Sequence, residues 1–291
     1  MPALMSTVAT GIRMVGAVSP ALAGRLAVAA FFSTSPRMPV RGDDRHTHHA
    51  AERGQIEVDG QRVTTYQWGR GTRTALIMHG WNSRAAQFAT LVRELVSEGF
   101  RVVGFDAPAN GDSTGRRTDV RDWVAAARIL GDAQGPFDLI VGHSFGGFAA
   151  LAAVRDGVHA PRVVIISAAG TVQAFHDQFQ RMLRLSPRTA TAFEHAFYRR
   201  MRMDRADAEA RYDSLRHPLP HDVELLIAHD ALDHRLDPRH SHDLHAAHDG
   251  HSRLVVTEGF GHNRTLRCDP VLDAVLEFVR APRGAASSPA R

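Results

Sequence analysis

Residues 137–150 read Phe137-Asp138-Leu139-Ile140-Val141-Gly142-His143-Ser144-Phe145-Gly146-Gly147-Phe148-Ala149-Ala150. The apolar run 137–141 follows Gly135-Pro136 and is typical of a buried strand, whereas 148–154 is apolar and alanine-rich, as in a buried helix. A strand that enters a helix through G-x-S-x-G must bend sharply at Ser144, and a Cβ at either flanking glycine would collide with a neighbouring element. The hydroxyl would then stand at the carboxyl edge of a sheet, over a helix N-terminus. Ser144 is therefore the candidate nucleophile. A chance match on a surface turn is disfavoured by the strand before it and the helix after it.

The length and composition indicate an ordinary globular protein. The 291 residues suffice for one large α/β domain or two small ones, and 44% of them are hydrophobic and 23% charged. All basic residues other than histidine are arginines, the formal net charge is only +4, and no basic stripe carries interleaved aromatics. Nucleic-acid binding is therefore not expected. The single cysteine, Cys268, excludes an internal disulfide and is expected to be a packed thiol.

The N-terminal part, residues 1–54, is expected to be a helix followed by a polar linker. Residues 1–32 are mildly apolar but contain Arg13, Pro20 and Arg25, which argue against a membrane-spanning helix and against the uninterrupted apolar core of a signal peptide. An amphipathic helix that packs on the protein body, or peripherally on a membrane, fits best, and a cytoplasmic location is expected. Residues 33–54 are polar, and their histidine cluster at 46–49 indicates a solvated linker rather than a metal site.

The body, residues 55–281, alternates strands with helices after an opening hairpin around Asp59-Gly60. Strands are expected at 55–58, 61–68, 74–79, 101–105, 137–141, 162–167, 223–228 and 254–256, and helices at 83–97, 118–133, 238–248 and 270–280. This order predicts an α/β fold with a mostly parallel sheet of about eight strands and helices on both faces. The tail, residues 282–291, has a disordered composition.

An insertion, residues 171–220, interrupts the alternation. It has no strand pattern, but its aromatic residues and methionines recur at helical spacing, as at Phe175, Phe179 and Met182. Because it lies between two core strands on the sheet edge that carries Ser144, it is predicted to be a helical lid. Most of these side chains would form the core of the lid, and some would line an apolar substrate pocket.

A serine nucleophile needs a base and an acid that orients the base. His262 lies in a glycine-rich loop between the last strand and the last helix, from which an imidazole can reach back over the sheet edge. Asp230, Asp233 and Asp237 compete for the role of the acid. Asp237 precedes Pro238 as an N-cap residue would, and Asp230 sits at the strand end, where it can cap the next turn. Asp233 is therefore the preferred acid, and Asp230 remains the alternative.

An oxyanion formed at the serine needs N–H donors that are already in place. The backbone N–H of Phe145, directly after the nucleophile, is one candidate. The loop His79-Gly80-Trp81 after the first buried strand supplies the other, with the N–H of Trp81 preferred because Gly80 permits a close approach. His79 is expected to brace this loop rather than to act as a second base.

Five motifs together resemble the α/β-hydrolase superfamily over about residues 55–280. They are His79-Gly80-Trp81, the D-A-P-A-N-G-D-S run at 106–113, Gly142 to Gly147, His229-x-x-x-Asp233 and Gly261-His262. The closest likeness is to bacterial serine hydrolases of the esterase and S33-peptidase-like branch. The resemblance implies a Ser144-Asp233-His262 triad, an oxyanion hole from Trp81 and Phe145, and no cofactor. Relatives usually have histidine where Asn110 stands, in a loop that is structural. Dehalogenases and epoxide hydrolases of this fold use an aspartate nucleophile, which Ser144 argues against.

The predicted activity is hydrolysis of small carboxylic esters through an acyl-enzyme. The alternatives are an amidase or aminopeptidase, for which Glu194, Asp204, Asp207 and Glu209 of the insertion could bind a substrate amine, and a catalytically silent ligand-binding scaffold. The histidines between 229 and 251 also suggest a metal site, since His242, His245 and His248 lie one helical turn apart. No carboxylate or cysteine completes a convincing ligand set, so neither a metal nor a cofactor is expected.

Overall fold

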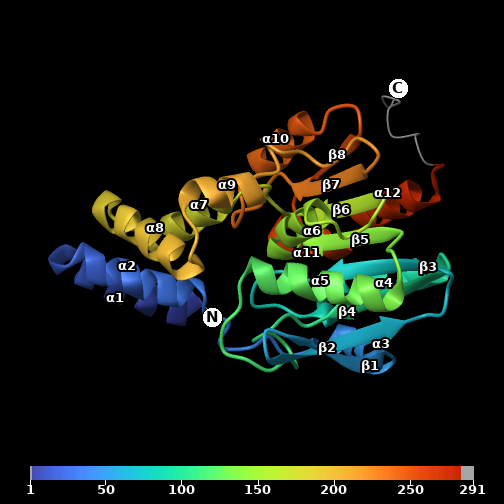
Figure 1. Cartoon of the computed structure of the whole chain (residues 1–291), viewed down its shortest axis with the longest axis horizontal. Helices are drawn as coiled ribbons and strands as arrows, with labels where there is room; N and C mark the ends of the chain where they lie inside the picture. Colours follow the sequence, from blue (N-terminus) through green and yellow to red (C-terminus); the bar gives the residue numbers. More distant parts are fainter. Residues whose placement is uncertain (1, 283–291) are drawn as a thin grey trace. The chain divides into compact units, whose positions relative to one another are not determined.

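The computed structural model describes residues 2–282, which form two compact units (Figure 1). The helical unit combines the chain up to Ser33 with Thr171–Asp213, and the sheet unit combines Thr34–Gly170 with the chain from Ser214 onward. The predicted disordered tail lies, apart from residue 282, outside the described residues.

The sheet unit is built on an eight-stranded sheet with the strand order β1-β2-β4-β3-β5-β6-β7-β8. Its strands are β1 (Glu52–Val58), β2 (Gln61–Trp68), β3 (Arg73–Met78), β4 (Phe100–Phe105), β5 (Leu139–His143), β6 (Arg162–Ile166), β7 (Glu224–Asp230) and β8 (Ser252–Thr257). β1 and β2 form the antiparallel hairpin, and β2 runs antiparallel to β4. All other neighbours are parallel. The predicted fold class is confirmed.

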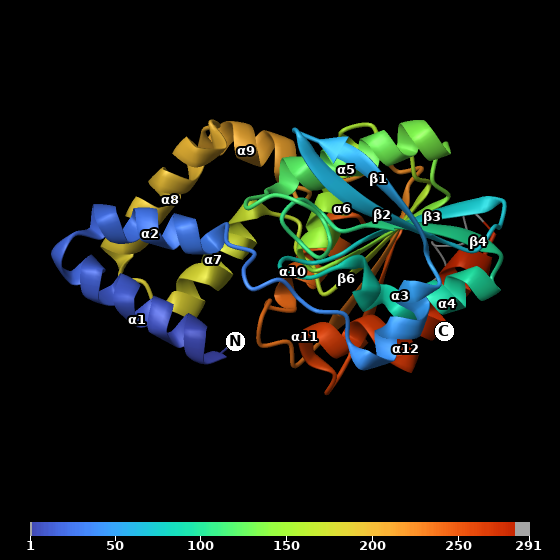
Figure 2. The ribbon, with the colours of Figure 1, turned by 90° about the horizontal axis from the view of Figure 1, so that it is seen from below.

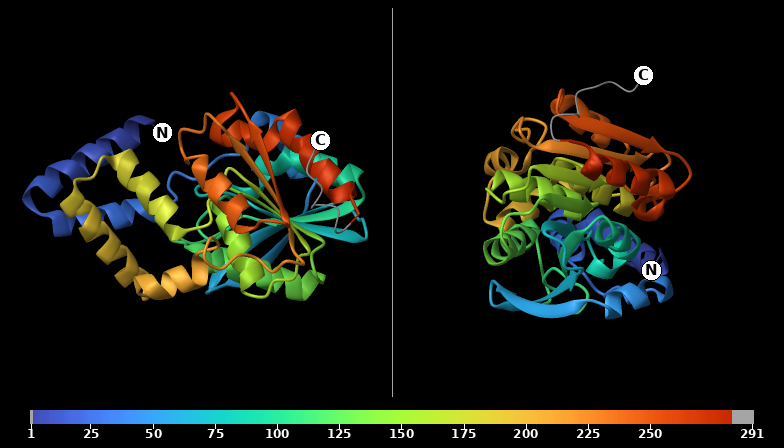
Figure 3. Two further views of the ribbon diagram at one scale, coloured as in Figure 1. Left: turned by 90° about the horizontal axis from the view of Figure 1, so that it is seen from above. Right: turned by 90° about the vertical axis from the view of Figure 1, so that its right-hand side faces the viewer.

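Helices lie on both faces of this sheet (Figures 2 and 3). They are α3 (Arg45–His49), α4 (Ala89–Ser97), α5 (Val120–Gln134), α6 (Phe145–Arg155), α10 (Arg239–Ala247), α11 (Gly261–Arg264) and α12 (Asp269–Arg280). Leu95 of α4 and Val275 of α12 belong to the same buried cluster as Ile77 and Val141 of the central strands. Because side chains alternate along a strand, the residues next to these in sequence face the opposite layer, where α5 and α6 lie.

The segment expected to be a solvated linker, residues 33–54, is partly folded. It contains a 3₁₀ turn at Gly42–Asp44 and then α3, and β1 begins at Glu52. Thr47 and His48 are buried, because the indole of Trp68 donates a hydrogen bond to the Thr47 carbonyl (2.7 Å) and the His48 ring packs on Tyr66. Polar composition concealed these contacts, since they are made with a strand further along the chain.

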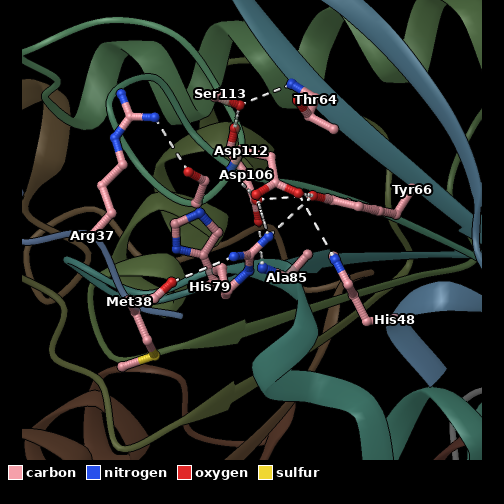
Figure 4. Close-up of polar contacts among 12 residues, drawn as sticks. Arg37, Met38, His48, Thr64, Tyr66, His79, Ala85, Asp106, Asp112 and Ser113 are labelled. Carbon is pink, nitrogen blue, oxygen red and sulfur yellow. Dashed lines mark hydrogen bonds and ion pairs between the residues drawn. The ribbon is translucent and has the colours of Figure 1, made fainter. Parts of the chain in front are cut away.

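A buried polar cluster around Asp106, at the end of β4, joins three loops of the sheet unit (Figure 4). Asp106 Oδ1 accepts the Ala85 N–H (2.8 Å), and Oδ2 accepts the Asp112 N–H (2.8 Å) and the Tyr66 hydroxyl (2.9 Å). The Arg84 guanidinium pairs with both carboxylates, at 3.3 Å from Asp106 and 2.8 Å from Asp112. The helix expected over 83–97 begins as a 3₁₀ turn, η2 (Ala85–Phe88), and becomes α4 only at Ala89. Asp106 accepts the N–H of Ala85, the first residue of this turn, which has no acceptor within the helix.

The helical unit contains α1 (Pro2–Val18), α2 (Pro20–Phe31), α7 (Val172–Leu183), α8 (Pro187–Met201) and α9 (Arg205–Tyr212). The N-terminal segment thus forms two helices rather than one, because Pro20 starts a new helix that the Ser19 hydroxyl caps by accepting the Leu22 N–H (3.3 Å). The small residues of α2 pack on α8 so closely that a Cβ on Gly24 would lie 2.6 Å from the Ala192 carbonyl carbon. Within residues 2–282, no helix combines the length and apolar character that crossing a bilayer requires.

The core of the helical unit is aromatic and encloses a histidine. The His176 ring is fully buried and meets the rings of Phe31, Phe193 and Phe197 edge-on, with its centroid 4.2 Å from that of Phe197. Neither ring nitrogen has a hydrogen-bond partner among the described residues. Burial lowers the pKa of His176 to about 4, because the imidazolium cannot be solvated there.

Asp106→Asn should lower the free energy of unfolding by about 1.5–3 kcal/mol, because it removes the buried carboxylate that accepts from Tyr66 and from two backbone N–H groups, and leaves the Arg84 guanidinium paired with Asp112 alone. The matched control is Glu277→Gln in the exposed Arg253–Glu277 pair, which should cost less than about 1 kcal/mol. Urea titrations of both variants measure the difference. Equal losses would contradict the structural role given to Asp106.

His176 should make the helical unit sensitive to acid. Burial lowers its pKa to about 4 in the folded state, below the value of about 6.5 that a solvated imidazole has in the unfolded chain, so the unfolded state binds a proton first as the pH falls. Stability is therefore unaffected at pH 7 and declines as the pH falls from about 6.5 to about 4, by up to about 3 kcal/mol. His176→Phe should reduce the difference in unfolding temperature between pH 7 and pH 5, whereas the exposed control His195→Gln should leave it unchanged. A wild-type-like pH difference in His176→Phe would refute this account.

Candidate functional site

Ser144 lies between β5, which ends at His143, and α6, which begins at Phe145. Its backbone adopts φ 54° and ψ −123°, a conformation that L-residues rarely adopt. The turn can close because its flanking positions are glycines: a Cβ on Gly142 would collide with the Gly146 carbonyl, and one on Gly146 with the Met78 carbonyl. These are the collisions expected from the sequence, and they explain why the serine side chain is directed out of the sheet edge.

His262 reaches Ser144 from the loop that follows β8. Its Nε2 lies 2.9 Å from the Ser144 Oγ and can accept the hydroxyl hydrogen. Two glycines in the loop, Gly259 (φ 90°) and Gly261 (φ 63°), have left-handed backbone conformations that favour glycine. The short helix α11 then begins at Gly261 and carries His262 in its first turn. The chain thereby turns sharply enough to bring the imidazole back over the sheet.

Asp233 is the carboxylate that contacts His262. The Nδ1–H of His262 donates to the Asp233 Oδ2 over 2.7 Å. The Asp233 Oδ1 accepts the backbone N–H groups of Arg235 (2.8 Å) and Leu236 (3.1 Å). Burial by itself would raise the pKa of Asp233, but hydrogen bonds from His229 and His262 hold this pKa well below its ordinary value. The carboxylate therefore stays ionised and oriented toward the imidazole.

The two competing aspartates are engaged elsewhere. Asp230 Oδ2 accepts the N–H of Phe260 (2.9 Å) and the Thr257 hydroxyl (2.9 Å), and its Oδ1 accepts the Leu232 N–H (3.1 Å). Asp230 thus holds the loop that precedes His262. Asp237 accepts the Arg239 N–H (3.0 Å), and its hydrogen bonds with Arg239 lower its pKa to about 2. It is not the N-cap expected from the sequence, because α10 begins only at Arg239 and Pro238 occupies the N-cap position.

The two candidate oxyanion donors lie next to the serine. Phe145 is the first residue of α6, where backbone N–H groups point out of the helix. A Cβ on Gly80 would lie 3.2 Å from the Ser144 Cβ, so the loop that carries Trp81 passes directly beside the nucleophile. The Trp81 ring stacks on Trp123 and meets the Phe145 ring edge-on, with centroids 5.7 and 5.0 Å apart.

His79 braces this loop, as expected. Its Nε2 accepts the Ala107 N–H (2.9 Å), its Nδ1–H donates to the Gly80 carbonyl (2.7 Å), and burial lowers its pKa. The Trp123 indole donates to the His79 carbonyl (3.1 Å). Asn110, which departs from the motif of relatives, is buried and donates from Nδ2 to the Pro108 carbonyl (3.0 Å), within the same region.

Sequence reasoning missed His143, which links the serine turn to the histidine loop. Its Nε2–H donates to the backbone carbonyl of His262 (2.9 Å). Complete burial lowers the pKa of His143 to about 3, so the ring is neutral in ordinary buffers. Its place directly before Ser144 was the available signal, but the motif leaves that position unspecified.

Two of the histidines considered for a metal site, His245 of α10 and His248 directly after it, have partners in the fold. His248 accepts the Leu219 N–H at Nε2 (3.0 Å), and His245 Nδ1 lies 2.7 Å from the Ser252 hydroxyl. Across residues 2–282, no three side chains of His, Cys, Asp or Glu are grouped so that they could hold a metal ion. The predicted packed thiol, Cys268, is buried.

Comparison with known proteins gives a consistent result. The profile of the alpha/beta hydrolase family matches residues 75–287. No curated protein sequence matches significantly. Similar solved structures include an esterase of Pyrococcus furiosus, with 17% identity, a TM-score of 0.64, and coverage of 86% of this chain and 97% of that one. Others are the mouse alpha/beta hydrolase domain-containing protein 10 (16%, 0.61, 79% and 97%) and a meta-cleavage product hydrolase of Pseudomonas fluorescens (22%, 0.56, 78% and 97%). At these identities the likeness shows the fold alone.

The two neighbouring aspartates provide a test of the site. Asp233→Asn should lower kcat for an activated ester by about 10⁴-fold, because His262 loses the carboxylate that fixes its tautomer. Asp230→Asn should lower kcat by about 10-fold or less and reduce thermal stability, because it loosens the loop without touching the imidazole. Steady-state kinetics and thermal unfolding of both variants separate the roles. A larger loss of kcat in Asp230→Asn than in Asp233→Asn would show that Asp230, and not Asp233, orients His262.

Proposed function

Because the chain belongs to the alpha/beta hydrolase family, we propose that it is a serine hydrolase that cleaves carboxylic esters of small molecules through an acyl-enzyme. One observation carries the proposal: a continuous hydrogen-bonded line from the Ser144 hydroxyl through His262 to Asp233, with lengths of 2.9 and 2.7 Å. The hydroxyl of Ser144 is a weak nucleophile by itself. Here it contacts a base, His262, whose tautomer is fixed by the carboxylate of Asp233. Membership of the esterase and S33-peptidase-like branch of the family is part of this proposal.

In the first half of the reaction, the Ser144 Oγ attacks the ester carbonyl carbon while His262 Nε2 takes the hydroxyl proton. The carbonyl oxygen becomes an oxyanion, and the N–H groups of Trp81 and Phe145 stabilise it. The intermediate then collapses, the bond to the alcohol oxygen breaks, and His262 returns the proton to the leaving alcohol. The acyl group remains on Ser144.

In the second half, water replaces the alcohol. His262 takes a proton from the attacking water, and the second intermediate expels Ser144, which regains its proton from the imidazolium. Asp233 stays a carboxylate throughout, because its hydrogen bonds keep its pKa well below the working pH. It compensates the charge that His262 carries in each transition state.

We also propose that α7, α8 and α9 act as a lid. They are inserted between β6 and β7, so they follow directly on a carboxyl strand end of the sheet. Closure of such an insertion would hold the substrate at the site and limit the access of bulk water to it. A cytoplasmic location and a small-molecule substrate are predictions from the sequence. Peripheral binding of residues 1–32 to a membrane is a prediction of the same kind.

The amide-hydrolase alternative receives no support from the carboxylates that prompted it. Glu194 accepts hydrogen bonds from Gln173 (3.4 Å) and Gln180 (3.2 Å). Asp204 caps α9 by accepting the Asp207 N–H (2.8 Å), and Glu209 pairs with Arg205 (2.8 Å). These side chains already serve the helical unit, so a simple structural role accounts for them.

The test is hydrolysis of p-nitrophenyl acetate and butyrate. The wild type should turn over both, and Ser144→Ala should lower kcat by about 10⁵-fold or more, as removal of a serine nucleophile does elsewhere. A fluorophosphonate probe should label the wild type and leave the variant unlabelled. A wild type that is folded but neither labelled nor active would favour the silent scaffold, and full activity of Ser144→Ala would refute the nucleophile. Faster turnover of aminoacyl-nitroanilides than of esters would favour the amide hydrolase.

A further inference from the structure

A second buried histidine contacts the triad acid. His229 is the sixth residue of β7 and lies four residues before Asp233. Its side chain is 1% exposed, and its Nε2 lies 3.1 Å from the Asp233 Oδ2. The same nitrogen lies 3.2 Å from the Leu236 carbonyl, and Nδ1 lies 2.6 Å from the hydroxyl of Ser241 in α10. Every ring nitrogen of His229 is therefore engaged.

These partners fix where the ring hydrogen lies. A carboxylate and a backbone carbonyl can only accept, so Nε2 must carry a hydrogen and donate it toward Asp233 and Leu236. The Ser241 hydroxyl can serve Nδ1 as donor or acceptor, because it rotates freely. His229 thus presents to Asp233 the same kind of N–H donor as His262 does from the other side.

With His229 included, the Asp233 carboxylate is fully hydrogen-bonded. Oδ1 accepts from the backbone N–H groups of Arg235 and Leu236, and Oδ2 accepts from the imidazoles of His262 and His229. A carboxylate offers about four lone-pair positions, and here each has a donor. The group is buried, so water does not replace a missing partner. The carboxylate plane is therefore held at both oxygens.

We propose that His229 is a positioning residue that holds the Asp233 Oδ2 in line with His262 Nδ1. The inference rests on the proposed serine hydrolase function and adds a fourth member to the hydrogen-bonded line, which becomes His229, Asp233, His262 and Ser144. His229 does not touch the reacting atoms. It acts by preventing rotation of the Asp233 carboxylate.

A purely structural role would be redundant for this turn. The turn after β7 is already closed by Asp233 Oδ1, which binds two backbone N–H groups, and by Asp230, which binds the Leu232 N–H. None of these bonds fixes the oxygen that faces His262. Only the contact from His229 joins His262 on Oδ2, so its loss should affect turnover more than folding.

The test uses two amide substitutions, each of which can replace only one of the two ring nitrogens of His229. The amide nitrogen of His229→Gln can reach the position of Nε2 and donate to Asp233, whereas the shorter amide of His229→Asn reaches only the position of Nδ1, near Ser241. His229→Asn should lower kcat for p-nitrophenyl butyrate by about 10- to 100-fold, as loss of a hydrogen bond to a charged group does, with KM within about 2-fold of wild type. His229→Gln should keep kcat within about 3-fold of wild type.

A spectroscopic measurement supplies the second readout. The low-field proton resonance of the hydrogen bond between His262 and Asp233 should shift or broaden in His229→Asn and stay in place in His229→Gln. Ser241→Ala removes only the contact at Nδ1 and should leave kcat and this resonance unchanged. Thermal unfolding of all three variants shows whether they fold.

The outcomes separate the inference from the function on which it rests. Folded His229→Asn with wild-type kcat, beside an inactive Ser144→Ala, would overturn the positioning role and leave the hydrolase function intact. Equal losses of kcat in the Gln and Asn variants, with equal losses of thermal stability, would also overturn it, because the ring would then serve packing alone. Full activity of Ser144→Ala would instead overturn the proposed function.

Discussion

The conformation of Ser144 is the constraint on which the site depends. A residue at φ 54° and ψ −123° is held there only if its surroundings leave it no alternative, and here β5, α6 and the end of β3 meet without room for a single methyl group at Gly142 or Gly146. The backbone strain is confined to Ser144, and the packing of the surrounding strands and helix compensates its free-energy cost. The serine hydroxyl is thereby directed where the two following loops can reach it.

Those loops reach the hydroxyl because residues at the ends of several strands bind and orient them. Asp230 ends β7 and binds the loop after β8 that carries the imidazole, and Asp233, in the turn that follows β7, contacts the imidazole itself. His143, which precedes the serine, fastens the same loop from a third strand. Burial keeps the pKa of His143 low, so this contact is made by a neutral ring whose hydrogen bonds do not change with pH in ordinary buffers. Asp230 and His143 thus hold the loop that carries His262 from two different strands.

The sequence was sufficient for a mostly parallel sheet of about eight strands and for the three residues that the structure brings within hydrogen-bonding distance, because strand periodicity and the glycines of G-x-S-x-G are local signals. It did not predict the order of the strands in the sheet. It was insufficient where a partner lies far along the chain. The His48 ring packs on Tyr66, and the start of the helix near Ala85 is bound by Asp106. His229 was noticed only as one of many histidines, because its contact with Asp233 arises from a turn whose shape the composition does not specify.

The helical unit is assembled from segments separated by about half of the chain, and this affects how the protein is made. Helix α2 leaves the ribosome early, but α8, which receives its small-residue face around Gly24, follows only after most of the sheet has been synthesised. Because domains fold as their residues emerge, the small-residue face of α2 stays uncovered until α8 has been synthesised.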